Sequence, residues 1–177
     1  MSRTRAGAPA LPEGHEKTEM VRSMFDAIAP RYDVVNRLMT FGLDMRWRRR
    51  TVRLLGLAPG SIVGDLACGT GDLCAIAGGE GLRVVGLDLS LGMLRAAHSS
   101  VPLVQADAAQ LPVATGALDG VVSGFAMRNF SDLAGVLAEV ARVVRPGGRV
   151  AFLDVDTPAN PVVGAIASMY SAGIQFM

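Results

Sequence analysis

The segment Asp65-Leu-Ala-Cys-Gly-Thr-Gly-Asp72 follows a short apolar run, Ser61–Ala67, and leads into a stretch with helical spacing, Asp72–Gly78. Gly69 and Gly71 allow the backbone to pass close to a ligand, and the first turn of the following helix offers unpaired N–H groups. The third glycine of the GxGxxG dinucleotide loop is replaced here by a cysteine. Because S-adenosylmethionine has no pyrophosphate for that glycine to approach, the segment favours S-adenosylmethionine over a dinucleotide.

Further apolar runs of strand length alternate with helical stretches after this segment. The expected strands are Ser61–Ala67, Arg83–Asp88, Leu103–Ala106, Leu118–Gly124 and Arg149–Asp154. The expected helices between them are Asp72–Gly78, Leu91–His98 and Asp132–Val144. Strands that alternate with helices imply a mostly parallel sheet with right-handed crossovers. The pattern therefore predicts an α/β, Rossmann-like fold of the class I SAM-dependent methyltransferase type, with a sheet flanked by helices.

Three helices are expected before the first strand, over His15–Ile28, Arg31–Phe41 and Met45–Leu55. Pro30 should end the first helix and Gly42 the second. In the third helix, Trp47 and Leu54 are expected to face inward and the arginines outward. We expect a single domain made of three parts: a flexible tail at 1–14, an N-terminal helical cap at 15–57 and a SAM-binding Rossmann-like domain at 58–177.

Composition narrows the class of protein. Half of the 177 residues are hydrophobic and 19% are charged, which excludes a disordered chain. With 17 basic and 16 acidic residues, the net charge of +1 argues against nucleic acid as a partner. No window reaches the roughly 18 uninterrupted apolar residues of a membrane span. The two cysteines lack metal-ligand spacing, so we expect no metal site and a reduced, cytoplasmic setting.

Acidic residues end three successive predicted strands. Asp65 could hold the positively charged amino group of the methionine, and Asp88 could accept both ribose hydroxyls. Asp107 could accept the adenine amino group, with the N–H of Ala108 on a ring nitrogen. Each feature has a simpler explanation, since a glycine turn is often structural and Asp88 could cap the next helix. Ligands of open parallel sheets bind beyond the carboxyl ends of the strands, however, and all three acids fall there.

From about residue 20 to residue 158 the sequence resembles the ubiquinone/menaquinone biosynthesis C-methyltransferases. The segments that carry the resemblance are Met24–Asp33 with Asn36, Phe41-Gly42, Trp47-Arg-Arg49, Asp65–Asp72, Asp107–Pro112, Phe125–Asn129 and Arg142–Gly148. The glycine loop and the Pro-Gly-Gly turn are common to many methyltransferases. The Tyr-Asp…Asn and Met-Arg-Asn segments are much more particular to this family.

The resemblance implies methylation of a ring carbon of a polyprenyl quinol, either demethylmenaquinol or its benzoquinol counterpart, with SAM as the methyl donor. It matches Thr70, Asp88, Asp107 and Ala108 to the family's cofactor contacts. Gly124 stands where the family often has a serine, so any cofactor contact there must come from the backbone. The alanine- and arginine-rich composition suggests a high-GC bacterium and tilts the choice towards menaquinone.

Candidates for aiding ionisation of the quinol are Arg128, Asn129, Tyr32 and Asp33. Arg128 is too basic to act as the base, but it could stabilise a phenolate or position a water. The simpler alternatives are a surface salt bridge for Arg128 and a core position for the Tyr32 ring. The histidines, at positions 15 and 98, match no catalytic position and are expected to be solvated.

A polyprenyl tail gains about 0.8 kcal/mol per buried CH₂ in a bilayer, so the enzyme must reach a substrate that stays in the membrane. We therefore expect peripheral contact with the inner face of the bacterial membrane. The arginines of the third helix could meet anionic headgroups: Arg46, Arg48, Arg49, Arg50 and Arg53. The uncharged Pro161–Met177 segment could form part of the tail channel. Alternatively, the arginines form a solvated face and the segment packs on the sheet.

Family members continue with a further helix and an antiparallel strand pair, so the last strands are expected to be missing from this chain. Two other functions stay open on the sequence: methylation of another small molecule, and an inactive SAM-binding scaffold or fragment. A nicotinamide dehydrogenase is a weaker third alternative. The sequence does not decide the oligomeric state.

Overall fold

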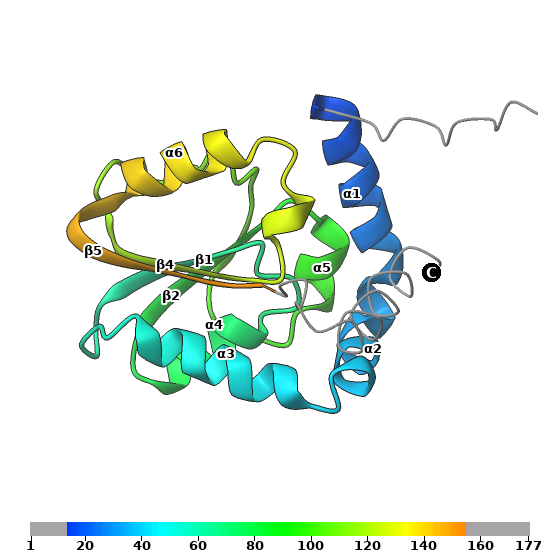
Figure 1. Ribbon diagram of the computed structural model, residues 1–177, viewed down its shortest axis with the longest axis horizontal. Helices are drawn as coiled ribbons and strands as arrows, with labels where there is room; N and C mark the ends of the chain where they lie inside the picture. The colour runs from blue at the N-terminus through cyan, green and yellow to red at the C-terminus, as the bar shows by residue number, and fades with distance from the viewer. Residues whose placement is uncertain (1–13, 155–177) are drawn as a thin grey trace, which may run out of the picture.

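The computed structural model describes residues 14–154, in which five parallel strands form one sheet between layers of helices (Figure 1). The strands are β1 (Ile62–Leu66), β2 (Arg83–Asp88), β3 (Leu103–Gln105), β4 (Leu118–Gly124) and β5 (Val144–Leu153). Their order in the sheet is β3-β2-β1-β4-β5, so the direction of chain progression reverses between β1 and β4. This arrangement confirms the predicted Rossmann-like sheet. The expected tail and the Pro161–Met177 segment lie outside the described residues.

Helices cover both faces of the sheet and bury one apolar cluster on each. Helix α6 (Leu133–Val143) lies over one face, where Val136 and Val140 pack with Leu66 and Val121. Helices α3 (Leu43–Leu54) and α4 (Asp72–Gly79) lie over the opposite face (Figure 1). Side chains alternate along a strand, so residues of β1 and β4 contribute to both clusters. Helix α5 (Leu91–Ala96) follows β2.

The predicted helical cap precedes β1. It consists of α1 (Gly14–Ile28), a 3₁₀ turn η1 (Ala29–Arg31), α2 (Tyr32–Met39) and α3. Pro30 lies in the 3₁₀ turn that ends α1, and Gly42 adopts a left-handed φ of 73° between α2 and α3, as expected. Figure 1 shows α1 and α2 at one end of the sheet, next to α5. The first two helices of the cap thus stand beside the ends of the strands, while α3 covers a face of the sheet.

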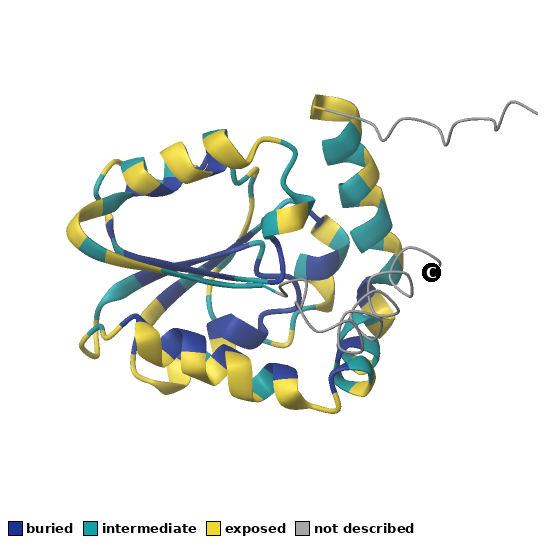
Figure 2. Ribbon diagram, viewed as in Figure 1, coloured by how far each residue is buried: buried dark blue, intermediate teal, exposed yellow. Residues whose placement is uncertain are grey.

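The predicted orientation of α3 was wrong for Trp47, Leu54 and Arg48, whereas the other arginines of the helix are exposed as expected. Trp47 is 40% exposed and Leu54 is 68% exposed, whereas Arg48 is buried together with Thr51 and Val52. Figure 2 shows the exposed residues along the outer side of α3. Arg48 lies on the inner side because two buried carboxylates and an aromatic ring receive its guanidinium, as described below. Its charge is compensated inside the protein, which the spacing of arginines in the sequence does not reveal.

β5 begins at Val144 rather than at Arg149, because Leu118 pairs with Val144 before the register shifts and Gly120 pairs with Arg149. At this point the two backbones approach closely. A Cβ atom on Gly120 would lie 2.8 Å from the carbonyl oxygen of Arg149 and 2.8 Å from Leu57 Cδ1. The strand contact between β4 and β5 therefore requires a glycine here.

Gly120→Ala should lower the free energy of unfolding by about 1–3 kcal/mol, since the carbonyl cannot move without breaking the β4–β5 register. Urea denaturation would measure the change. Gly79→Ala is the matched control: Gly79 ends α4, no atom lies within 4 Å of its Cβ position, and its φ is not left-handed. That control should be neutral or stabilising by about 0.4–1 kcal/mol. Equal stability of the two variants would contradict the close approach.

Candidate functional site

A cavity of about 360 Å³ lies at the carboxyl ends of β1, β2 and β4. Its volume falls in the range of roughly 300–1,000 Å³ that is typical of small-molecule sites. Helix α1 forms one wall through side chains that include Val21 and Phe25. The strand side of the cavity is lined by Leu66, Ala67, Gly69, Asp88, Asp107, Ala108 and Gly124. The cavity therefore lies at the switch in strand order, where open parallel sheets bind ligands.

The residues directly after two central strands have a left-handed backbone conformation. Ala67, after β1, has a φ of 51°, and Phe125, after β4, has a φ of 61°. A non-glycine residue in this region costs on the order of 1–3 kcal/mol and persists where its surroundings hold it. Both residues line the cavity. Two of the three non-glycine residues with a left-handed φ among residues 14–154 therefore lie at the site, while Gly69 and Gly71 adopt φ values of 57° and 89° without that cost.

Asp88 fixes the glycine loop. One carboxylate oxygen accepts the N–H of Gly69 at 2.8 Å, and the other accepts the N–H of Ser90 at 2.8 Å. Burial raises the pKa of the Asp88 carboxyl above its ordinary value, although both backbone hydrogen bonds oppose this shift. The N-cap of α5 is Ser90, whose hydroxyl accepts the N–H of Met93 at 3.1 Å. Asp88 is therefore not the capping residue, and it reaches the cavity.

Asp107 and Ala108 follow β3 at another part of the cavity wall. Asp107 is exposed, and one of its oxygens accepts the N–H of Ala109 at 2.9 Å. This local turn holds the carboxylate in place and leaves its other oxygen available to a ligand. Gly124 also lines the cavity, and a Cβ atom there would lie 2.9 Å from Leu73 Cδ1.

Three expected cofactor residues lie behind the cavity wall. Asp65 is fully buried and accepts a hydrogen bond from Cys74 Sγ at 3.1 Å. Its other oxygen has no hydrogen-bond partner among the described residues, and burial raises the pKa of its carboxyl to about 7. Thr70 is buried, and Gly71 precedes α4, where a Cβ atom would lie 2.7 Å from that of Ser99.

The candidate catalytic residues separate into two groups. Tyr32 and Asn129 line the cavity, whereas Asp33 and Arg128 do not belong to its lining. The Tyr32 ring packs edge-on against Phe25 with centroids 5.9 Å apart, and burial raises the pKa of its hydroxyl. Arg128 is exposed and its Nη2 donates to Asp154 at 2.9 Å. Asp33 accepts a hydrogen bond from Thr70 Oγ1 at 2.6 Å.

Two residues near the glycine loop have roles that the sequence did not reveal. Arg48 Nε lies 3.7 Å from carboxylate oxygens of both Asp44 and Asp72, and its guanidinium stacks 5.0 Å from the centre of the Phe125 ring. His98 is half exposed but is not simply solvated, since its Nε2 lies 3.3 Å from Asp72 Oδ1. The spacing of Asp44 and Arg48, one helical turn apart, was the available signal for a buried pair.

Asp65 should make stability depend on pH. The folded pKa lies above the unfolded value, so between pH ~4 and ~7 the folded chain keeps a proton that the unfolded chain has lost. Ionising Asp65 therefore destabilises the fold as the pH rises through this window, by up to about 4 kcal/mol. Asp65→Asn removes this loss, so its stability relative to wild type should increase from pH 4 to 7 and then level off. Urea denaturation without cofactor measures the difference.

Asp119→Asn is a control of opposite sign. Hydrogen bonds from the Ile62 N–H and from Arg145 lower the pKa of the Asp119 carboxyl, so its stabilisation is present above the unfolded pKa and is lost as the pH falls. This variant should be less stable than wild type at neutral pH and approach it under acid conditions. A constant difference between Asp65→Asn and wild type across pH 4–7 would contradict the raised pKa of Asp65.

Comparisons with known proteins identify the family. The ubiE/COQ5 methyltransferase family matches residues 13–176. A demethylmenaquinone methyltransferase of Corynebacterium kroppenstedtii is 44% identical over 156 residues, which are 88% of this chain and 68% of that protein. The ubiquinone/menaquinone biosynthesis C-methyltransferase UbiE of Syntrophotalea carbinolica is 42% identical over 85% of this chain and 67% of its own. The chain thus spans about two thirds of the length of these relatives.

Solved structures show the same fold. A protein described as a methyltransferase from an antibiotic biosynthesis pathway of Anabaena variabilis superposes with a TM-score of 0.63 at 26% identity, over 75% of this chain and 55% of its own. A SAM-dependent methyltransferase of Mesorhizobium loti superposes with a TM-score of 0.51 at 30% identity, over 57% of this chain and 50% of its own. With a matched family over nearly its whole length and a class I methyltransferase fold, the chain belongs to the ubiE/COQ5 methyltransferase family.

Proposed function

We propose that this protein transfers a methyl group from SAM to a ring carbon of a polyprenyl quinol and converts demethylmenaquinol to menaquinol. The observation that carries this proposal is the cavity, which brings the glycine loop and Asp88 together with Tyr32 and Asn129. The relatives named demethylmenaquinone methyltransferase support the choice of quinol. The proposal includes activity of this chain by itself, because the chain spans about two thirds of the length of those relatives.

The residues present fit SAM. The Asp88 carboxylate would accept hydrogen bonds from the ribose hydroxyls. Asp107 would accept a hydrogen bond from the adenine amino group, and the Ala108 N–H would donate to a ring nitrogen. Asp65 faces Cys74 behind the cavity wall, so its carboxylate would act on the methionine ammonium group through its charge and not by direct contact. Gly69 would leave room for the ligand, since only Met93 Cε lies within 4 Å of its Cβ position. When bound, SAM supplies a methyl group on a positively charged sulfur.

The protein's own residues then exclude water and position the quinol. The apolar wall of α1, with Val21 and Phe25, excludes water from the reacting carbon. Tyr32 and Asn129 hold the quinol hydroxyl and orient the ring for in-line attack. The ring carbon would gain the methyl group as the bond between methyl and sulfur breaks, which would leave a neutral thioether. The ring carbon would then lose its hydrogen as a proton to solvent, so no oxidant or reductant is needed. In this structure Arg128 pairs with Asp154, so it would stabilise a phenolate only after leaving that partner.

Titration of SAM into the purified chain, followed by methyl transfer to demethylmenaquinol, tests the proposal. Asp88→Asn should weaken SAM binding about tenfold or more, because it removes a charged acceptor. Tyr32→Phe should leave the Kd for SAM unchanged and lower kcat by roughly 10–100-fold, if its hydroxyl positions the quinol. Binding without transfer by the wild type would support the inactive scaffold or fragment, and equal transfer to a quinol without a prenyl tail would support a small-molecule methyltransferase.

We also infer that the protein acts in the cytoplasm at the inner face of the membrane, with α3 towards the lipid. No helix within residues 14–154 is long and apolar enough to cross a bilayer. Arg46, Arg49 and Arg50 are exposed along the outer side of α3, whereas Arg48 is buried and no longer counts among the contacts. Arg53 pairs with Glu80 at 3.2 Å. The positive charges of the three exposed arginines complement the negative charge of anionic headgroups.

Replacing Arg46, Arg49 and Arg50 together by glutamine should weaken binding to vesicles that contain anionic lipid on the order of a hundredfold, since each arginine contributes about 1 kcal/mol near such a surface. Vesicle co-sedimentation measures the partition. A variant with Arg83, Arg95 and Arg149 replaced by glutamine loses the same charge from other exposed positions. If both triple variants lose binding equally, net charge rather than the α3 face accounts for it.

A further inference from the structure

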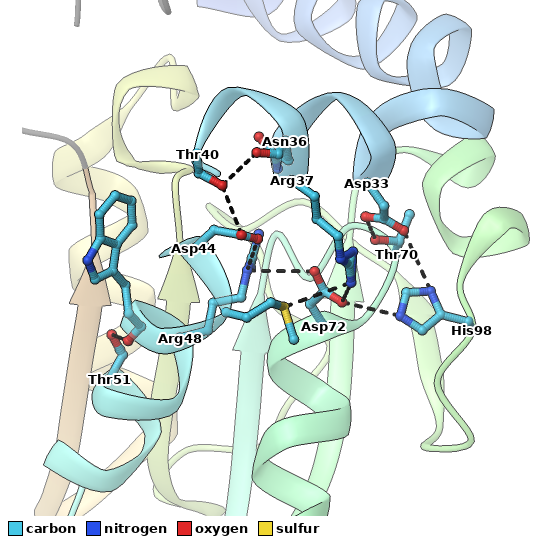
Figure 3. Close-up of polar contacts among 12 residues, drawn as sticks. Asp33, Asn36, Arg37, Thr40, Asp44, Arg48, Thr51, Thr70, Asp72 and His98 are labelled. Carbon is cyan, nitrogen blue, oxygen red and sulfur yellow. Dashed lines mark hydrogen bonds and ion pairs between the residues drawn. The ribbon is translucent and has the colours of Figure 1, made fainter. Parts of the chain in front are cut away.

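Three polar links join cap helix α2 to the glycine loop and α4, as Figure 3 shows. Thr70 Oγ1 donates to Asp33 Oδ1 at 2.6 Å, and Arg37 Nη2 donates to Asp72 Oδ1 at 3.0 Å. The imidazole of His98 lies between the two carboxylates, with Nδ1 3.6 Å from Asp33 and Nε2 3.3 Å from Asp72. We call these five residues the latch.

Asp72 is the centre of the latch. It is the first residue of α4, where a negative charge is favoured by the helix N-terminus, and its side chain is only 7% exposed. It contacts Arg37 from α2, Arg48 from α3 and His98 from the segment after α5. A buried carboxylate needs such partners, because leaving it uncompensated costs several kcal/mol. Asp72 thereby ties two cap helices to the start of the glycine-loop helix.

The latch adjoins the cavity without belonging to its lining. Asp33 follows Tyr32, which lines the cavity, and Thr70 follows Gly69, whose N–H is held by Asp88 at the cavity. None of the latch residues is among those that line the cavity. A change in the latch therefore removes no direct ligand contact, but it frees the neighbours that make such contacts.

We propose that Arg37 and Asp72 are positioning residues that hold α2, and with it Tyr32, over the cavity during methyl transfer. This inference rests on the proposed function for its effect on turnover. Breaking the Arg37–Asp72 pair lets α2 move away from the glycine loop, so Tyr32 spends less time in place to orient the quinol. Asp88, Asp107 and Ala108 lie at the ends of β2 and β3, outside α2. The latch therefore affects kcat more than the affinity for SAM.

Arg37→Gln is the sharpest test, because the Arg37 side chain is 40% exposed and its loss should not unfold the protein. Asp72→Asn would instead also remove one of the two buried carboxylates that Arg48 contacts. We expect amide hydrogen exchange of Tyr32–Met39 to accelerate about fivefold, kcat to fall about fivefold or more, and the Kd for SAM to stay within about twofold. Arg37→Lys should restore part of both effects. Exchange in α6 should not change.

The matched control is Arg53→Gln, which breaks the ion pair of α3 with Glu80 at the opposite end of α4. It should leave exchange in α2 and kcat as in wild type. The latch proposal is overturned if Arg37→Gln and Arg53→Gln give the same α2 exchange and the same kcat. If the wild type binds SAM but transfers nothing, the proposed function fails, and α2 exchange in the Arg37 variants still decides whether the latch holds the helix.

Discussion

The hydrogen bond from the Gly69 N–H to the Asp88 carboxylate connects the ends of two neighbouring strands, and the site is built around it. β1 and β2 lie side by side in parallel, so the loop after β1 passes the last residue of β2. The loop can turn its N–H towards that residue because Ala67 and Gly69 take left-handed conformations. The carboxylate is thereby fixed at the cavity, although burial disfavours its charge. If water took the place of the Asp88 carboxylate in this hydrogen bond, the glycine loop would be free to move.

Unfavourable features gather at this end of the sheet. Ala67 and Phe125 have strained backbones, Asp65 is buried with a raised pKa, and Arg48 and Asp72 place charges inside the protein. Buried ion pairs contribute little to net stability, but they fix geometry, because each charge is costly without its partner. The apolar clusters on the two faces of the sheet supply the stability that allows these features. Such a division between a stable core and a strained end is expected of a binding site.

The sequence predicted the strands well because apolar runs, acidic ends and glycine breaks are local signals. It also placed Asp88, Asp107 and Gly69 at the ligand edge, since all parallel strands end there. The direction in which the Asp65 side chain points could not be predicted from this rule. Side chains alternate along β1, so Leu66 turns towards α6 and the cavity, while Asp65 turns towards Cys74 of α4. The burial of Arg48 depends on Asp72 as well as on Asp44, and the local spacing indicates only the pair with Asp44, because Asp72 is distant in sequence.

Helix α2 shows why the cap depends on polar contacts. It has eight residues, and only Asn36 among them is buried, so apolar burial contributes little to holding it. A helix this short is not stable by itself and takes its position from its neighbours. Consecutive residues on a helix point about 100° apart, which lets Tyr32 face the cavity while Asp33 faces the glycine loop. The same turn of helix therefore both lines the site and fastens it, and a few hydrogen bonds and ion pairs at Asp33 and Arg37 determine how firmly the cavity is covered.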